Sequence, residues 1–266
     1  MDKTQILEKY KKEDERLLVC KLFDKILLAD KQNKVQITDF LTPVELQLLK
    51  DVLKMLDCKN YSIYGGLEDA NRNIIVIFPD KLEYVFKENA FDYNSICNCV
   101  RITNSSENYD HKVYLGGLIK LGIKREKIGD IVVYNNGADV VVSKDVSKFI
   151  LSNLCQLTRF CKSTVEIVKL EEIVKKVQEF KEVKIVVSSM RLDNVVSELA
   201  KTSRSKALDI LKQERVFINY KSEIKATKMV NMADVITIRG VGKFIVETIA
   251  NNMKSGKYVV MVKKFM

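Results

Sequence analysis

A pair of cations at the expected start of a helix is the clearest chemical signal in this sequence. In the stretch TSRSKALDILKQERVFINYK, residues 202–221, Ser203 is a typical N-cap residue, and Arg204 and Lys206 follow in the first helical turn. This end of a helix has free backbone N–H groups and a partial positive charge, so cations are disfavoured there unless an anion lies nearby. Together with Ser205, the free N–H groups and the two cations suit a phosphate. The stretch therefore predicts contact with a nucleic-acid backbone.

Two short helices and several strands must hold these side chains in place. Apolar residues at helical spacing predict one helix over Leu192–Leu199 and a second that starts after Ser203. Alternating patterns predict the strands Arg215–Asn219, Val235–Arg239 and Lys243–Thr248. Basic residues that follow the second helix are expected to extend the same surface: Arg215, Lys221, Lys225 and Lys228.

The positive charge of the chain is concentrated in the same region. The 266 residues carry a formal charge of +10, and residues 183–266 contain 16 Lys and Arg against 7 Asp and Glu. No apolar run approaches the roughly 20 residues needed to span a bilayer, and the charged N-terminal sequence is unlike a secretory signal. We therefore expect a cytoplasmic protein that does not insert into membranes.

Metal and cofactor chemistry have little support in the sequence. The six cysteines include no C-x-x-C pair, and His111 is the single histidine, so free thiols are expected. Cys97 and Cys99 are the only candidate metal ligands, and this spacing suits two buried strand residues equally well. No glycine-rich phosphate loop or nucleophile elbow is present. We expect no metal, no cofactor, no small-molecule substrate and no enzymatic activity.

The chain as a whole has the pattern of an α+β protein. A helix is predicted from Pro43 to about Leu56, with Thr42 and Glu45 as a capping box. Helices and strands then alternate in an order resembling an RNA-recognition sheet, without the aromatic signature that stacks bases. The predicted regions are helical N-terminal residues 1–58, a central antiparallel α/β sandwich at 59–170, a charged connector at 171–183 and a small domain at 184–266. Residues 170–184 are expected to be helical.

The small C-terminal domain resembles the S-four domain, an RNA-binding fold named after small-subunit ribosomal protein four. The motifs RLD at 191–193, SRSKA at 203–207, RVFIN at 215–219 and ADVI at 233–236 match that family in order and spacing. This resemblance implies contact of the second helix and the adjoining strand with structured RNA. It carries over to Arg191, Ser203, Arg204, Ser205, Lys206, Arg215, Asn219 and Lys221. Two residues depart from the pattern, because Tyr220 and Ala233 stand where glycines are usual.

Other motifs are similar to those of the YlmH family, bacterial S-four-domain proteins encoded among cell-division genes. These are LGGLIKLGIKREKIGDI at 115–131, FLTPVE at 40–45 and YGG at 64–66, whereas residues 70–73 lack the acidic-basic pattern expected after the paired glycines. The similarity implies an RNA-binding protein at the large ribosomal subunit, acting on ribosomal RNA, tRNA or both, in translation or the rescue of stalled ribosomes.

Four alternatives stay open at this point. Lys124, Arg125 and Lys127 are either a second RNA contact or part of a loop shaped by the surrounding glycines. An Arg-Leu-Asp triplet carries the catalytic aspartate in one family of pseudouridine synthases, but the helical pattern after Asp193 favours a first-turn acid here. An RNA-modifying site in the central domain would make the protein an enzyme. An adaptor role in cell division is the fourth.

Overall fold

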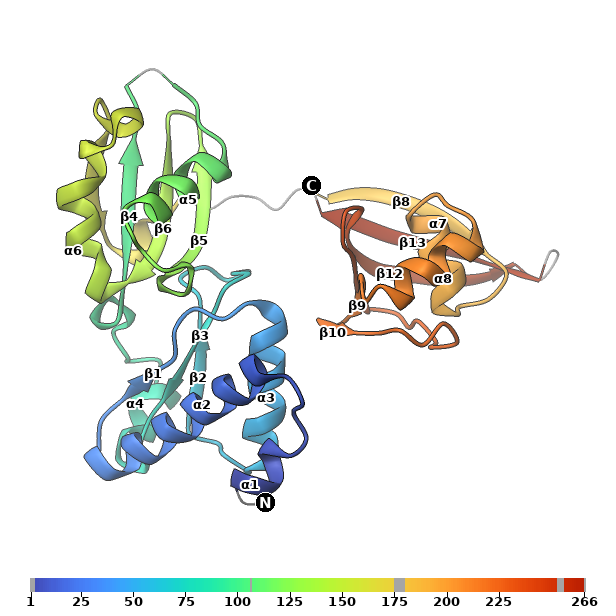
Figure 1. The fold of residues 1–266 in the computed structure, drawn as a ribbon, viewed down its shortest axis with the longest axis horizontal. Coiled ribbons are helices and arrows are strands. Elements are labelled where there is room, and N and C mark those ends of the chain that lie inside the picture. Colours follow the sequence, from blue (N-terminus) through green and yellow to red (C-terminus); the bar gives the residue numbers. More distant parts are fainter. Residues whose placement is uncertain (1–2, 106, 175–179, 253–255, 266) are drawn as a thin grey trace. The chain divides into compact units, whose positions relative to one another are not determined.

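The structure is a computed structural model that describes residues 3–105, 107–174, 180–252 and 256–265. Its contacts divide the chain into two compact units, residues 1–176 and residues 177–266, and each unit is described by itself (Figure 1). Helices and antiparallel sheets are present in both units, which confirms the predicted α+β class. Within the described ranges no helix is both long and apolar enough to cross a bilayer.

The first part of unit 1 packs helices against a three-stranded antiparallel sheet of order β1-β3-β2. Its elements are α1 (Lys3–Leu7), α2 (Glu13–Gln32), β1 (Gln36–Ile37), α3 (Pro43–Met55), β2 (Tyr61–Tyr64) and β3 (Ile74–Ile77). The predicted capping box of α3 is confirmed, because the Thr42 hydroxyl accepts from the Glu45 N–H at 3.3 Å and the Glu45 carboxylate accepts from the Thr42 N–H at 2.6 Å.

The second part of unit 1 is a four-stranded antiparallel sheet of order β5-β6-β4-β7, reached through the short helix α4 (Glu83–Lys87). Its elements are β4 (Cys97–Thr103), α5 (His111–Lys120), β5 (Ile128–Tyr134), β6 (Gly137–Ser143), α6 (Lys144–Asn153) and β7 (Thr164–Val168). The alternation of helices and strands agrees with the pattern predicted for the central region. Apolar residues of α5 and α6 share one buried cluster with residues of β4, β5 and β6.

Strand β3 connects the two parts of unit 1 because its successive side chains point to opposite faces of the sheet. Ile75 and Ile77 pack with the helices α2 and α3, whereas Ile74 and Val76 lie in a second cluster. That second cluster also contains buried residues of β4, β5 and β6. Strand β3 therefore contributes both to the cluster under the N-terminal helices and to the cluster that it shares with the central sheet.

Unit 2 is built on a six-stranded antiparallel sheet of order β10-β9-β11-β12-β13-β8. Its elements are β8 (Phe180–Val187), α7 (Leu192–Leu199), α8 (Arg204–Lys212), β9 (Val216–Ile218), β10 (Lys221–Ser222), β11 (Val235–Ile238), β12 (Gly242–Asn252) and β13 (Lys257–Phe265). Apolar residues of α7 and α8 form one core with alternate residues of the strands, so both helices pack on the same face of the sheet (Figure 1).

The predicted helical connector is wrong from residue 180 onward. Phe180 starts β8, which pairs along its length with β13 in the register Phe180↔Phe265 to Val187↔Tyr258. Residues 175–179 of the predicted connector lie outside the described residues. The charged residues of this stretch are also typical of a solvent-exposed helix, which is why a helix was predicted. Strand β8 lies at the edge of the sheet, where charged side chains are usual. Strand β13 was not among the predicted strands either.

Candidate nucleic-acid interface

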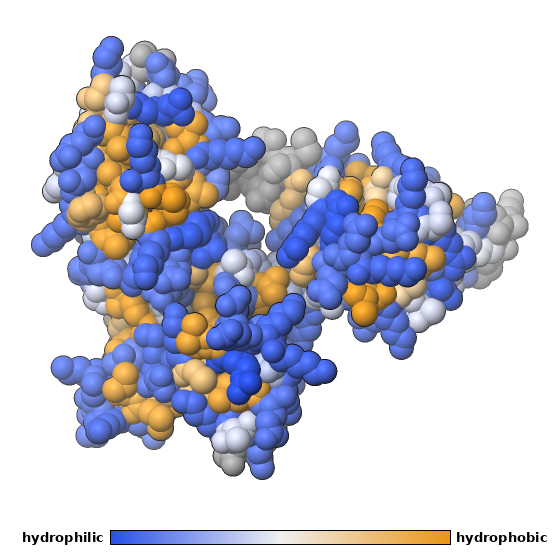
Figure 2. All heavy atoms as spheres, viewed as in Figure 1, coloured by the Kyte–Doolittle hydropathy of each residue, from blue (hydrophilic) through white to orange (hydrophobic). Residues whose placement is uncertain are grey.

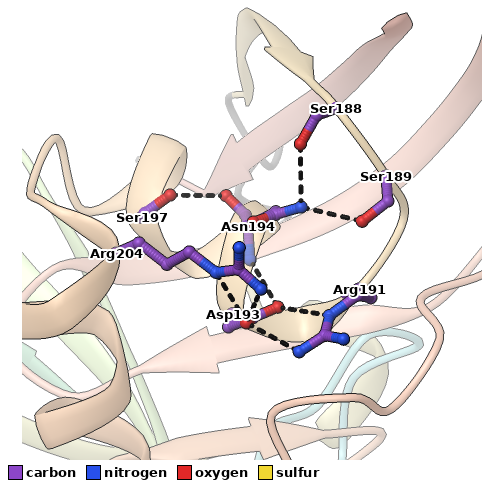
Figure 3. A network of polar contacts seen from close by, with 7 residues as sticks. All are labelled: Ser188, Ser189, Arg191, Asp193, Asn194, Ser197 and Arg204. Carbon is purple, nitrogen blue, oxygen red and sulfur yellow. Dashed lines mark hydrogen bonds and ion pairs between the residues drawn. The ribbon is translucent and has the colours of Figure 1, made fainter. Parts of the chain in front are cut away.

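A buried carboxylate between two arginines stands at the start of α7 (Figure 3). Arg191 donates from Nε and Nη2 to the two carboxylate oxygens of Asp193, at 3.1 and 3.0 Å. Arg204, the first residue of α8, donates from Nε and Nη2 to Asp193 Oδ2, at 2.9 and 2.7 Å. The Asp193 side chain is 1% exposed, whereas that of Arg204 is 55% exposed. The buried Asp193 carboxylate thus fixes the positions of two guanidinium groups at the surface.

The surroundings of Asp193 favour its ionised form. Burial alone raises the pKa of Asp193, but the hydrogen bonds and charges of Arg191 and Arg204 outweigh it, and the net pKa is lowered. Asn194 supports the site from the other side, since its amide Nδ2 donates to the Ser188 and Ser189 hydroxyls at 3.1 and 2.7 Å. Its backbone N–H donates to Asp193 Oδ1 at 3.1 Å. The carboxylate is therefore fixed in position by three residues.

The start of α8 has the cap that the sequence predicted. The Ser203 hydroxyl accepts from the Lys206 N–H at 3.4 Å and lies 2.9 Å from the Ser205 hydroxyl. Arg204 in the first turn has an anionic partner within the protein itself, namely Asp193. Lys206 is exposed, and its side chain makes no hydrogen bond or ion pair within the described residues. Its ammonium group remains available for an external anion.

The segment before β11 brings further cations to the start of α7. The carbonyl of Lys228 accepts from the Leu192 N–H at 2.8 Å, and the carbonyl of Ala226 accepts from the Asp193 N–H at 3.2 Å. Arg191 forms an isolated β-bridge with Met229. The exposed Lys225 and Lys228 lie on this segment. Arg191, Arg204 and this lysine-bearing segment therefore meet at the same end of unit 2.

Arg215 and Asn219 have structural partners that the sequence did not reveal. Arg215 Nη2 donates to the carbonyl of Arg239 at 2.7 Å. The Asn219 amide donates to Asp234 Oδ1 at 2.8 Å and accepts from the Val235 N–H at 2.9 Å. Both residues thus brace β9 against β11. Their contribution to an RNA surface stays a prediction, as does that of the exposed Lys221 on β10.

The two departures from the S-four pattern keep the backbone conformation that glycine adopts most readily. Tyr220 has φ of 66° and Ala233 has φ of 65°, both in the left-handed region. Asn219 precedes Tyr220 with φ of 48°, and Ile218 pairs with Lys221, so β9 and β10 are joined by a two-residue turn of the I′ kind. The turn keeps its shape at the cost of backbone strain at Tyr220.

The three cations of the central motif have different surroundings. Lys127 Nζ lies 3.0 Å from both Asp39 Oδ1 and Asp145 Oδ2. Arg125 donates from Nη1 to the carbonyl of Ile128 at 2.5 Å, and burial lowers its pKa. Lys124 is exposed, and no ion pair involves its side chain in the described ranges. Lys124 is therefore the member of the triplet that best fits an RNA contact.

Asp130 explains the loop at 70–73 that departs from the YlmH pattern. Its carboxylate accepts from the backbone N–H groups of Asn71 and Arg72 at 2.6 and 3.1 Å. Arg72 in turn donates from Nε to the carbonyl of Ile128 at 3.0 Å and from Nη2 to that of Phe40 at 2.5 Å. The loop and the central motif are thus fixed to one another. Sequence reasoning missed this role because the partners are more than fifty residues apart.

The two buried cysteines of β4 lie in an apolar environment. Cys97 and Cys99 lie 1% and 0% exposed in the cluster between the two sheets of unit 1. Burial raises the pKa of each thiol to about 12, so both stay protonated at neutral pH. Over the described ranges no three His, Cys, Asp or Glu side chains are grouped closely enough to hold a metal ion.

Three comparisons with known proteins bear on this chain. Residues 90–173 match the family described as "Putative RNA-binding domain in YlmH". "Ribosome-associated protein quality control protein P2" of Bacillus subtilis (strain 168) is 29% identical over 256 residues, which cover 95% of this chain and 96% of that protein. The solved structure "Cell division protein ylmH from Streptococcus pneumoniae" has 17% identity and a TM-score of 0.47, and the alignment covers 62% of this chain and 98% of that one.

Proposed function

We propose that this protein is a member of the YlmH family and binds structured RNA at the ribosome, because residues 90–173 match the YlmH RNA-binding domain and a 29% identical relative spans nearly the whole chain. The domain match supports RNA as the ligand, and the name of the Bacillus relative supports the ribosome as the place. The matched range 90–173 lies in unit 1, and the predicted S-four-type motifs lie in unit 2. Both units therefore take part in the proposed binding.

The observation that carries the proposal is the arrangement around Asp193. Arg191 and Arg204 are held at the surface by one buried carboxylate, and the free Lys206 lies in the same first turn as Arg204. Guanidinium groups in fixed positions bind phosphate oxygens with little loss of side-chain entropy. The backbone N–H groups at the start of α8 add donors for the same phosphates.

We infer that the RNA is ribosomal RNA of the large subunit, tRNA or both, and that the protein acts during the rescue of stalled ribosomes. The quality-control function in the name of the Bacillus relative supports this finer assignment. The basic surface itself supports a phosphate backbone rather than a particular sequence, because phosphate contacts position a protein without reading bases.

The experiment that tests the proposal is crosslinking of the tagged protein to RNA in cells, followed by sequencing of the attached RNA. We expect reads concentrated in large-subunit ribosomal RNA and tRNA, and crosslinked peptides from the start of α8. Reads spread evenly over messenger RNA, or recovery of division proteins without RNA, would contradict the proposal. Incubation of RNA with the protein and nucleoside analysis would show a modified base if the protein were an enzyme.

We propose Lys124 as the second RNA contact, in unit 1. Lys124→Glu is expected to weaken cosedimentation with ribosomes and to leave the melting temperature unchanged. Lys127→Glu serves as the matched variant, because it breaks two ion pairs of 3.0 Å and is expected to lower the melting temperature. If the folded Lys124→Glu protein cosedimented with ribosomes as the wild type does, Lys124 would not be an RNA contact and the triplet would have only a structural role.

A further inference from the structure

The two faces of the unit 2 sheet differ in what they carry. Side chains that alternate with the core residues point to the face opposite α7 and α8, which we call the open face. It includes aromatic, apolar and basic side chains: Phe180, Lys184, Val186, Phe217, Arg239, Lys243, Ile245, Met261, Lys263 and Phe265. Phe180 is 42% exposed and Val186 is 44% exposed, so this surface is not closed as a core would be.

Cations on the open face lie against aromatic rings. The Arg239 guanidinium carbon is 4.8 Å from the centre of the Phe217 ring. Lys243 Nζ is 5.0 Å from the Tyr220 ring and 4.4 Å from the Phe265 ring. Tyr220 thus extends from the turn after β9 over this face. Rings beside cations are the arrangement by which proteins stack unpaired bases and hold the phosphates between them.

The charge of the open face favours an anionic occupant. Its cations are Lys184, Arg239, Lys243 and Lys263, and its acids are Glu182 and Glu247. Glu247 is already paired with Lys263 at 2.5 Å. Lys184, Arg239 and Lys243 make no ion pair in the described residues, and Glu182 is the one other acid of this set, so these side chains leave the face with a net positive charge. A nucleic-acid strand supplies one phosphate for each base, which suits cations that lie among aromatic rings.

The open face continues into the surface proposed for structured RNA. Arg239 carries the carbonyl that accepts from Arg215, and its guanidinium stacks on Phe217 of β9. Tyr220 lies between Asn219 and Lys221, two of the residues predicted to contact RNA. Arg215, Asn219 and Lys221, which are predicted to contact RNA, therefore lie at the β9–β10 edge beside residues of the open face.

We propose that the open face binds unpaired nucleotides that adjoin the bound RNA helix, with bases stacked on Phe265, Tyr220 and the Arg239 guanidinium. The inference rests on the proposed function, because it extends the same RNA beyond the α8 surface. The Arg239 guanidinium lies over the Phe217 ring, and Arg239 is exposed, so a base can approach it from solvent. Lys243, placed between two rings, supplies the phosphate contact.

The test uses the full-length protein and two RNA hairpins with the same stem, one blunt and one with a single-stranded tail of about eight adenosines. One tail position carries 2-aminopurine, whose fluorescence falls when the base stacks. The variants are Phe265→Leu, Arg239→Ala and Tyr220→Gly. Tyr220→Gly removes the ring and also relieves the left-handed strain at φ of 66°, so the variant is expected to fold, which its melting temperature checks. Phe149→Leu, at an exposed phenylalanine of α6, is the matched control.

We expect the tailed hairpin to bind at least about fivefold more tightly than the blunt one and its fluorescence to fall on binding. The three open-face variants should lose this preference and keep the affinity for the blunt hairpin, and Phe149→Leu should behave as the wild type. Equal affinity of the wild type for both hairpins, or variants that keep the preference, would overturn the inference. If the wild type does not bind the blunt hairpin, the proposed function fails as well, which separates the two outcomes.

Discussion

At the scale of single residues, Asp193 resolves the apparent conflict of a cation in the first turn of α8. Helix dipoles disfavour Arg204 at that position, but a carboxylate of lowered pKa lies 2.7 Å from its guanidinium. The sequence predicted Asp193 only as a first-turn acid of α7. Its second role depends on the way α7 and α8 fold against each other, so spacing along the chain does not reveal it.

Asp193→Asn is expected to lower both stability and RNA affinity. An amide cannot accept charge-assisted hydrogen bonds from two arginines, so the free energy of unfolding should fall by about 1–3 kcal/mol. Arg191 and Arg204 lose their fixed positions, and affinity for structured RNA falls with them. Asp209→Asn, at an exposed acid of α8, makes the same change in net charge. Urea unfolding measures the stability of both variants, and anisotropy titrations measure their RNA affinity. If net charge alone decided binding, both variants would bind RNA more tightly than the wild type, and this outcome would contradict the assigned role of Asp193.

The pH dependence of unfolding should follow from the same residue. Because the pKa of Asp193 is lowered in the folded state, its contribution is fully present above the ordinary value of about 3.9 and is lost as pH falls through the lowered pKa. In urea titrations between pH 7 and 2, the difference between wild type and Asp193→Asn should therefore shrink in acid. If the difference in free energy of unfolding stayed constant over this pH range, the lower stability of Asp193→Asn would be due to packing and not to the lost charge.

At the scale of elements, the two cations at the start of α8 have different roles, although the sequence predicted the same role for both. Arg204 is bound to Asp193, and Lys206 is exposed. Arg204→Glu would place a second carboxylate beside the buried Asp193, and we expect it to destabilise unit 2. Lys206→Glu leaves that network intact and suits the helix dipole, so it should raise stability by about 0.3–1 kcal/mol. It should also weaken RNA binding and reduce the salt slope by about 0.7–0.9.

Lys212→Glu is the matched charge reversal at the other end of α8, where an acid is unfavourable to the dipole. Melting temperature and RNA affinity measured on one preparation compare the two variants. Lys206→Glu should melt no earlier than the wild type and bind less, and Lys212→Glu should melt earlier and lose less affinity. A folded Lys206→Glu protein with wild-type affinity would remove the start of α8 from the interface.

Elements with local signals were predictable from the sequence, and those with distant partners were not. The capping box of α3 and the cap at Ser203 involve residues three apart, and both appear in the structure. Strand β8 pairs with β13 about eighty residues later, and its charged sequence gave no sign of that partner. The same reason hid the bonds from Asp130 to the loop at 70–73, which depend on the sheets of unit 1 meeting.

At the scale of the whole molecule, the chain is organised as two compact units, and the excess charge belongs to the second. The S-four-type motifs were predicted to lie in a domain at 184–266, but a fragment cut at Lys184 would lack the first four residues of β8. Those residues pair with the end of β13. A fragment of residues 177–266 keeps the complete six-stranded sheet, and we expect it to fold as a unit.

The most direct test of the central claim is the salt dependence of RNA binding by this fragment and by the full-length protein. Fluorescence anisotropy across a salt series gives the slope of log K against log salt for one structured RNA. We predict a steep negative slope for both proteins, because each phosphate contact contributes about 0.7–0.9 to the magnitude of the slope. The slopes of the two proteins should differ by no more than the contribution of about one contact. Binding that is insensitive to salt, or a folded fragment that does not bind, would contradict the claim that unit 2 carries the RNA interface.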